Sequence, residues 1–158
     1  MVLCTGCSVK DIIESEVDEF DTVAHQNKHC VETAEKVYDA IKERDAQKLK
    51  DTLCKKVMDK KTLDDDIQSL FDFVSGDIES YRYITDPATS EEIRDGEIVR
   101  LNGYPTIKDV KTSDGTVYNI TVWVVLIYTD EDWEGVTKVS IRKEGSDKYR
   151  KVGMEFDY

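Results

Sequence analysis

The sequence VYNITVWVVLIYT, residues 117–129, decides the fold class because it alternates like a strand and carries apolar residues on both faces. The first face consists of Tyr118, Ile120, Val122, Val124, Leu126 and Tyr128. The second face consists of Asn119, Thr121, Trp123, Val125 and Ile127. Such a strand lies in the middle of a sheet, so we expect one face to meet helices and the other to meet little solvent or a partner.

Further alternating segments surround this strand. Residues 106–112 precede it, and Asp114-Gly115 forms the kind of turn that joins two strands into a hairpin. Helical periodicity is confined to the chain before residue 77, which predicts an α+β class with helices packed on one side of an antiparallel sheet. The other strands are predicted at residues 77–85, 96–102, 136–144 and 149–156, with residues 86–92 as a polar connection.

Three helices are predicted before the strands. The apolar stripe of the first consists of Cys30, Ala34, Val37, Tyr38 and Ile41. The second follows an N-cap at Asp45, and its stripe consists of Ala46, Leu49, Leu53 and Val57. The third begins with a capping box from Thr62 to Asp65 and stops at Gly76, and its stripe consists of Leu63, Ile67, Leu70, Phe71 and Val74.

Length and charge limit the function. The chain has 158 residues, enough for one domain with one adequate core. Its 34 acidic and 22 basic residues leave a formal net charge of -12, which opposes phosphate backbones and excludes sequence-independent nucleic-acid binding. The same charge repels anionic membrane surfaces, and the sequence has no run apolar enough to span a membrane. Any membrane attachment must therefore come from a lipid.

The four cysteines are too few and too unevenly placed for a disulfide scaffold. Cys30 lies on the first helical stripe and Cys54 flanks the second. If the two helices form a hairpin about Asp45, these thiols lie too far apart for a disulfide, which needs a Cα separation below about 7 Å. We expect two packed thiols.

The pair in CTGC, residues 4–7, allows three interpretations. A redox motif needs a strand before it, and only three residues precede Cys4. A zinc site would join Cys4 and Cys7 to His25 and His29, but residues 8–24 form a gap longer than the usual span of about 12–15 residues and rich in carboxylates. The third interpretation is a lipid anchor.

CTGC followed by Ser8 looks like the end of a bacterial lipoprotein signal, with Cys7 as the lipidated residue and small residues before it. Cys4 stands where leucine is usual, and the preceding apolar segment is very short. We predict that residues 1–28 are a truncated lipoprotein signal remnant and an acidic tether, and that residues 29–158 are the single domain. A coil of about 20 residues spans roughly 25 Å, enough to hold an acidic domain clear of headgroups.

Two stretches resemble a known group. VYDAIKERDAQKLKDTL (37–53) resembles the opening of the nuclear transport factor 2-like (cystatin-like) superfamily. LDDDIQSLFDFVSGDIESY (63–81) looks like an uncharacterised family, a domain of unknown function, of proposed lipoproteins from Gram-positive gut bacteria. The resemblance implies a cystatin-like α+β roll, with three N-terminal helices packed in the concave side of a strongly bent antiparallel sheet. It also implies a domain anchored by lipid to the outer face of the cell membrane, or a cytoplasmic one if Met1 is the true start.

The superfamily implies a pocket between the helices and the sheet, but no particular function. Our candidate pocket-lining residues are Tyr38, Tyr83, Tyr118, Trp123 and Tyr128. We predict no catalytic residue, metal or cofactor, because His25 and His29 precede the first predicted helix and lie on no strand. We expect a binding module for a small apolar ligand, a peptide or a surface protein, with a homodimer through the Trp123 face as a further interpretation. The alternative is a pocket enzyme of the isomerase, dehydratase or cyclase type.

Overall fold

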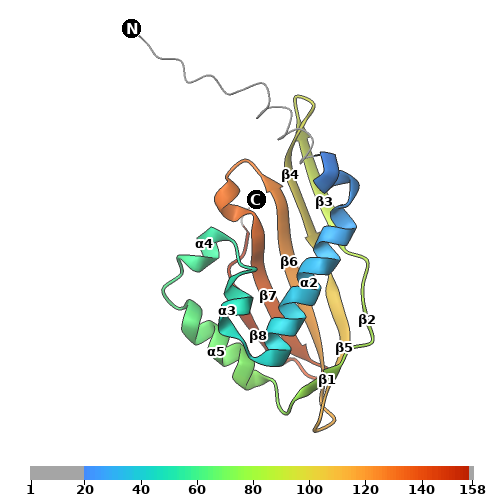
Figure 1. The fold of residues 1–158 in the computed structure, drawn as a ribbon, viewed down its shortest axis with the longest axis vertical. Helices are drawn as coiled ribbons and strands as arrows, with labels where there is room; N and C mark the ends of the chain where they lie inside the picture. The colour runs from blue at the N-terminus through green and yellow to red at the C-terminus, as the bar shows by residue number, and fades with distance from the viewer. Residues whose placement is uncertain (1–19, 157–158) are drawn as a thin grey trace.

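The computed structural model describes residues 20–156, within which helices precede an antiparallel sheet (Figure 1). The helices are α2 (Gln26–Glu43), α3 (Ala46–Lys50), α4 (Lys55–Met58) and α5 (Leu63–Phe73), and the 3-10 helix η1 (Glu131–Trp133) lies between the sixth and seventh strands. The strands are β1 (Ile78–Ser80), β2 (Tyr83–Ile84), β3 (Ala88–Arg94), β4 (Glu97–Tyr104), β5 (Thr106–Thr112), β6 (Val117–Tyr128), β7 (Gly135–Lys143) and β8 (Tyr149–Gly153). The eight described strands form one sheet that does not close, so the predicted α+β class is confirmed.

The predicted central strand is β6, and both of its edges are occupied. On one edge, its first half pairs with β5 and its second half pairs with β4. Between these two segments, the Val122 N–H donates to the Pro105 carbonyl at 3.0 Å. On the other edge, β7 pairs with β6 from Tyr118 to Val125. Because β4 and β5 share one edge of β6 in succession, they act as one long strand that bends at Pro105.

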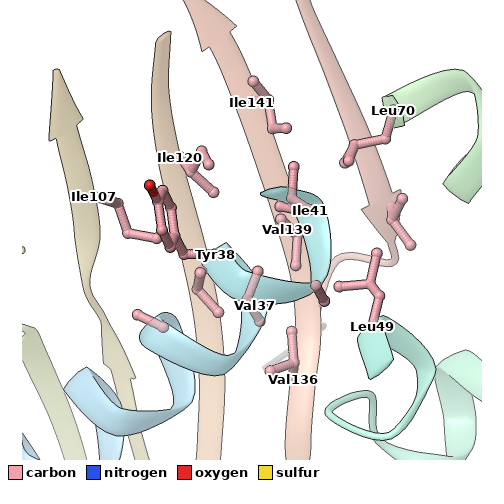
Figure 2. Close-up of a cluster of buried hydrophobic side chains, with 14 of the residues drawn as sticks. Val37, Tyr38, Ile41, Leu49, Leu70, Ile107, Ile120, Val136, Val139 and Ile141 are labelled. Atoms are coloured by element: carbon pink, nitrogen blue, oxygen red, sulfur yellow. The ribbon is translucent and has the colours of Figure 1, made fainter. Parts of the chain in front are cut away.

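Helix α2 crosses the sheet over β6, and the core lies between them (Figure 1). The α2 residues of this core are Cys30, Ala34, Val37, Tyr38, Ala40 and Ile41. Figure 2 shows Val37 and Ile41 among the labelled side chains of β5, β6 and β7, which are Ile107, Ile120, Val136, Val139 and Ile141. The predicted helix-facing side of β6 is confirmed from Tyr118 to Val124. Each such side chain contributes about 1.5–3 kcal/mol on burial.

Residues 20–24 are also helical, and α2 starts at Gln26. The predicted boundary between tether and domain, residues 28 and 29, falls inside α2. His25 precedes α2 without a side-chain capping hydrogen bond, so the sequence carries no N-cap signal at the point where the helix begins.

Of the two predicted helix caps, one is confirmed. The Asp45 carboxylate accepts a hydrogen bond from the Lys48 N–H at 3.0 Å. The capping box from Thr62 to Asp65 is wrong, because the Thr62 side chain caps nothing and instead donates to the Asp66 carboxylate at 3.1 Å. The apolar face predicted for this helix is buried throughout.

The second predicted helix is two helices, α3 and α4, and residues 20–24 form a further helical segment before α2, so the prediction of three helices is not confirmed. Between α3 and α4 the backbone bonds to β7: the Val136 N–H donates to the Thr52 carbonyl at 2.9 Å, and the Cys54 N–H donates to the Val136 carbonyl at 3.0 Å. The prediction of one continuous helix is wrong because these groups bond to a strand instead of to their own turn. The predicted apolar residues of this segment that are buried are Leu49, Leu53 and Val57.

Two strand predictions are also corrected. The connection predicted at residues 86–92 is mostly strand, because β3 pairs with β4 from Ala88 to Arg94. β3 is an edge strand exposed along most of its length, so it lacks the apolar alternation that identifies half-buried strands. The strand predicted at 77–85 is divided into β1 and β2, which pair with β5 on either side of an extra residue near Asp109, where φ is 55°.

The C-terminal end of α5 is held by Arg44, which sequence analysis did not single out. Arg44 ends α2 in the left-handed conformation, with φ at 52°. Its guanidinium donates to the carbonyls of Phe71 at 2.6 Å and Val74 at 2.9 Å. The Phe71 carbonyl also accepts the Val74 N–H at 3.2 Å, so Arg44 adds a second donor at the helix end and ties the end of α2 to the end of α5.

Tyr118 holds the same region from the sheet. Its hydroxyl accepts a hydrogen bond from the Ser75 N–H at 3.0 Å and donates to the Phe73 carbonyl at 3.2 Å. The side chain is 2% exposed. The phenol therefore joins the start of β6 to the segment that leaves α5.

The two described cysteines, Cys30 and Cys54, are free and buried, as predicted. Burial raises the pKa of the Cys30 thiol to about 11 and also raises that of Cys54. Cys30 faces Gly103 of β4, and a Cβ added at Gly103 would lie 2.5 Å from the Cys30 Sγ. Glycine at this position lets α2 approach the sheet.

We predict that Gly103→Ala lowers the free energy of unfolding by about 1–3 kcal/mol, because the added methyl group overpacks the contact with Cys30. Cys30→Ala alone should be destabilising, whereas in the Gly103→Ala background it should restore stability. Urea unfolding of the four chains measures this cycle. Cys54→Ala is the control and should lower the free energy of unfolding by the same amount with and without Gly103→Ala. Additive effects of the Cys30 and Gly103 substitutions on that free energy would contradict the prediction.

We also predict that Tyr118→Phe lowers the free energy of unfolding by about 0.5–1.5 kcal/mol, because the Ser75 N–H and the Phe73 carbonyl lose the buried hydroxyl that bonds to both. Thermal and urea unfolding provide the measurement. Tyr149→Phe removes the same hydroxyl from a side chain that is 47% exposed and should leave stability unchanged. Equal stabilities of the two variants would show that the Tyr118 hydroxyl does not hold α5.

Candidate functional site

The structure distributes the five predicted pocket-lining residues over several places. Tyr38 is buried in the core, with its ring edge-on to Tyr81 at 4.8 Å between centroids. Tyr83 lies on β2 and is 47% exposed, with the Arg82 guanidinium 5.8 Å from its ring. Tyr118 has the structural hydrogen bonds described above. These three tyrosines do not share a cavity wall.

Trp123 and Tyr128 both lie in space near Phe156, at the C-terminal end of the described chain. The Lys138 ammonium lies 3.8 Å from the centre of the Trp123 ring. Trp123 and Phe156 border a cavity of about 60 Å³, which has room for a few water molecules. The Phe156 ring contacts Tyr128 at 4.9 Å and Trp133 at 5.1 Å, both edge-on. The C-terminal segment thus covers this side of the sheet.

Tyr118 borders an open groove of about 800 Å³ beside α5. The charged residues that line this groove are Asp65, Asp72, Lys143, Lys148 and Arg150. All five are exposed, which is the ordinary state of charged side chains at a protein surface. The lining of this groove has no aliphatic residue, so its apolar surface is limited to the rings of Phe73 and Tyr118.

A different cavity, of about 330 Å³, lies between α2 and the second half of β6. Its floor is apolar and consists of Val124, Val125 and Leu126. Its walls come from the helical residues 20–24, from α2, from the end of α3 and from the start of β7, and its polar members are Thr22, His29, Thr33, Lys36, Asp51, Thr52 and Glu134. The cavity is open, and its lining combines three apolar with seven polar residues. Small-molecule sites also combine an apolar surface with polar groups that fix the orientation of the ligand.

His29 lies in this wall because residues 26–43 are helical. Its Nε2 atom is buried and has no hydrogen-bond partner within the described chain, and the nearest carboxylate oxygen belongs to Asp21, 3.9 Å away. Sequence analysis placed His29 before the first helix and so missed it. The signal that could have found it is its spacing of four residues from Thr33 on one helical face.

Two threonines present acceptors to the cavity. The Thr33 hydroxyl donates to the His29 carbonyl at 2.8 Å, and the Thr52 hydroxyl donates to the Leu49 carbonyl at 2.7 Å. A hydroxyl has one proton, so each oxygen keeps only lone pairs for a ligand.

Glu134 is the second residue that sequence analysis missed, because it lies in the acidic turn before β7. One oxygen of its carboxylate accepts the Tyr128 N–H at 3.1 Å. Partial burial raises the pKa of the Glu134 carboxyl, an effect opposed by the Tyr128 N–H and increased by the nearby charge of Glu131. No basic side chain of the described chain lies within 4 Å of Glu134, so its charge is not neutralised.

The predicted lipidation site, Cys7, lies outside the described residues, as does Cys4 of the zinc alternative. Within residues 20–156, no group of three or more His, Cys, Asp or Glu is placed to hold a metal ion. None of the helices in that part of the chain is long and apolar enough to cross a membrane.

Residues 36–144 match a family described as a domain of unknown function (DUF5104). No curated protein matches the chain. The matched range runs from α2 into the turn after β7 and includes the whole of β6. The sequence prediction of an uncharacterised family is thereby confirmed. Because the match covers more than half of the chain, the chain belongs to this family, the domain of unknown function DUF5104.

Proposed function

We propose that the chain is a non-catalytic binding module and that the cavity between α2 and β6 is its ligand site. The observation that carries this proposal is the combination of volume and lining: about 330 Å³, an apolar floor on β6 and polar groups on the walls. Ligand pockets have volumes of about 300–1,000 Å³, so this cavity suits a small ligand.

The enzyme alternative has weaker support. An isomerase, dehydratase or cyclase needs a buried acid or base beside donors that stabilise a developing charge. Glu134 is the carboxylate with a raised pKa in the cavity, but the residue is exposed and holds a single backbone donor. His29 lines the same cavity without a carboxylate closer than 3.9 Å to orient it. These features suit binding better than proton transfer.

The arrangement of helices also supports our proposal that the domain is a nuclear transport factor 2-like member. In this superfamily helices lie on one side of a bent antiparallel sheet and a pocket opens between them. Here α2 lies on one side of β6, the β4–β5 segment bends at Pro105, and the cavity lies between α2 and β6. This placement is a likeness of architecture and specifies no activity.

We further propose that the protein is a lipoprotein anchored through Cys7 at the outer face of the membrane. The support is the CTGC-Ser8 pattern and the acidic residues that follow it. Lipid chains contribute about 0.8 kcal/mol for each buried CH₂ group, so more than one acyl chain can hold an acidic domain at a membrane that repels it. A ligand would then be taken from outside the cell.

The cavity proposal is tested by filling the cavity. We predict that Leu126→Trp, and separately Thr33→Phe from the opposite wall, abolish binding of small ligands, because the larger side chains occupy the space. The measurement is a fragment screen by backbone amide chemical shifts, with the largest shifts expected at Thr33, Thr52 and Leu126. Circular dichroism confirms that each variant folds.

Ile93→Trp on the exposed edge strand β3 is the matched control and should bind as the unsubstituted protein does. Fragments whose shifts map to another surface, or that bind equally well to the filled variants, would contradict the proposal.

The anchoring proposal predicts that Cys7→Ser removes lipid from the protein. The gene, with its natural upstream sequence, is expressed in a Gram-positive host supplied with labelled palmitate, and the label is followed through fractionation. Cys4→Ser should keep the label in the membrane fraction. An unlabelled and purely cytosolic unsubstituted protein would exclude the anchor.

A further inference from the structure

The cavity between α2 and β6 contains charges of both signs that do not neutralise one another. Glu134 and Asp51 supply two carboxylates, and Lys36 supplies an ammonium group. All three side chains are exposed, and none of them forms an ion pair within 4 Å in the described part of the chain. They surround a floor of three aliphatic residues. Opposite charges that are held apart around one cavity can be bridged by a ligand that carries both.

We propose that the ligand of this cavity is a zwitterion, either a free amino acid or a short peptide, an inference that rests on the proposed function. The ligand ammonium binds Glu134 and Asp51. The ligand carboxylate binds Lys36. An apolar side chain of the ligand lies on the floor formed by Val124, Val125 and Leu126.

The free hydrogen-bond acceptors around Glu134 and Asp51 support our proposal that the ligand ammonium binds there. Glu134 uses one acceptor for the Tyr128 N–H, and Asp51 uses one for the Gln47 side-chain amide at 2.8 Å. The remaining carboxylate lone pairs, together with those of the two threonine hydroxyls, accept hydrogen bonds but cannot donate them. An ammonium group has three donors and no acceptor, so it matches this surface.

The donors of the cavity lie on α2. Lys36 follows Thr33 along the helix and is exposed, and no carboxylate of residues 20–156 lies within 4 Å of its ammonium. His29 adds a buried Nε2 atom that has no hydrogen-bond partner among the described residues. A carboxylate on the ligand would accept from Lys36, and a charge-assisted bond of this kind is about twice as strong as a neutral one.

The test separates the two charges of the ligand. The probes are leucine and the dipeptide Leu-Leu, each compared by titration calorimetry with its N-acetyl form, its C-terminal amide and the doubly capped form. We expect capping of either end to weaken binding about tenfold, which corresponds to about 1.4 kcal/mol. Whether the free amino acid or the dipeptide binds more tightly distinguishes the two sources of this chemistry.

Substitutions assign each charge to its partner. Glu134→Gln should weaken binding of leucine or Leu-Leu about tenfold and leave the N-acetyl form, which has no ammonium, unchanged. Lys36→Gln should weaken the same ligands and leave the C-terminal amide unchanged. The controls are Glu144→Gln and Lys61→Gln, which change the same charges at exposed positions outside the cavity and should have no effect.

Three results would overturn the inference. The first is equal affinity of the free and doubly capped ligands, which would leave apolar contact as the only attraction. The second is a loss of all ligand forms alike in Glu134→Gln, which would indicate a structural role. The third is no binding of any form while the fragment screen still finds ligands in the cavity; in that case the binding module stands and the zwitterion does not.

Discussion

The packing of α2 against one side of β6 is the contact on which the rest of the structure depends. Both edges of β6 are paired, so its side chains can only be buried by elements that cover its faces. On the helix side, the residues from Tyr118 to Val124 are buried against α2 and its neighbours. The close approach at Gly103 and the attachment of α5 through Arg44 and Tyr118 follow from this contact, because each fixes a neighbouring element to α2 or to β6.

The cavity arises where this regular contact ends. In an uninterrupted strand, Val124 and Val125 would face opposite sides of the sheet. Here the register shifts on both edges of β6, against β4 between Val125 and Ile127 and against β7 where Thr137 is the extra residue, and three consecutive residues line one cavity. Irregular pairing of this kind is common next to binding sites. The cavity therefore lies where the pairing of β6 is irregular on both edges.

The sequence predicted the helices and strands that have a buried apolar face. It missed the breaks and the edge strand that depend on hydrogen bonds between distant parts of the chain. The stripes of α2 and α5 and the alternation of β6 are consequences of local periodicity, so they could be recognised. The break at Thr52 could not, because it depends on a pairing with Val136, far away in the chain. The sequence did not predict β3 as a strand, because an edge strand exposed on both faces has no apolar alternation. The aromatic residues selected as pocket-lining mostly serve the core or the sheet surface, whereas the cavity uses residues with weak sequence signals.

Some of these failures of prediction meet at the cavity. The unrecognised start of α2 brings His29 into its wall, the break after α3 contributes Thr52, and the register of β6 against β4 shifts at Leu126, which lines the floor. The missed edge strand β3, the absent capping box at Thr62 and the division of residues 77–85 lie elsewhere. A chain that folds by burial alone would continue each regular element through the positions at the cavity, since regular pairing satisfies backbone groups at the least cost. Local rules are often broken where a protein binds something, so the three departures that meet at the cavity support a ligand site together with its volume and its lining.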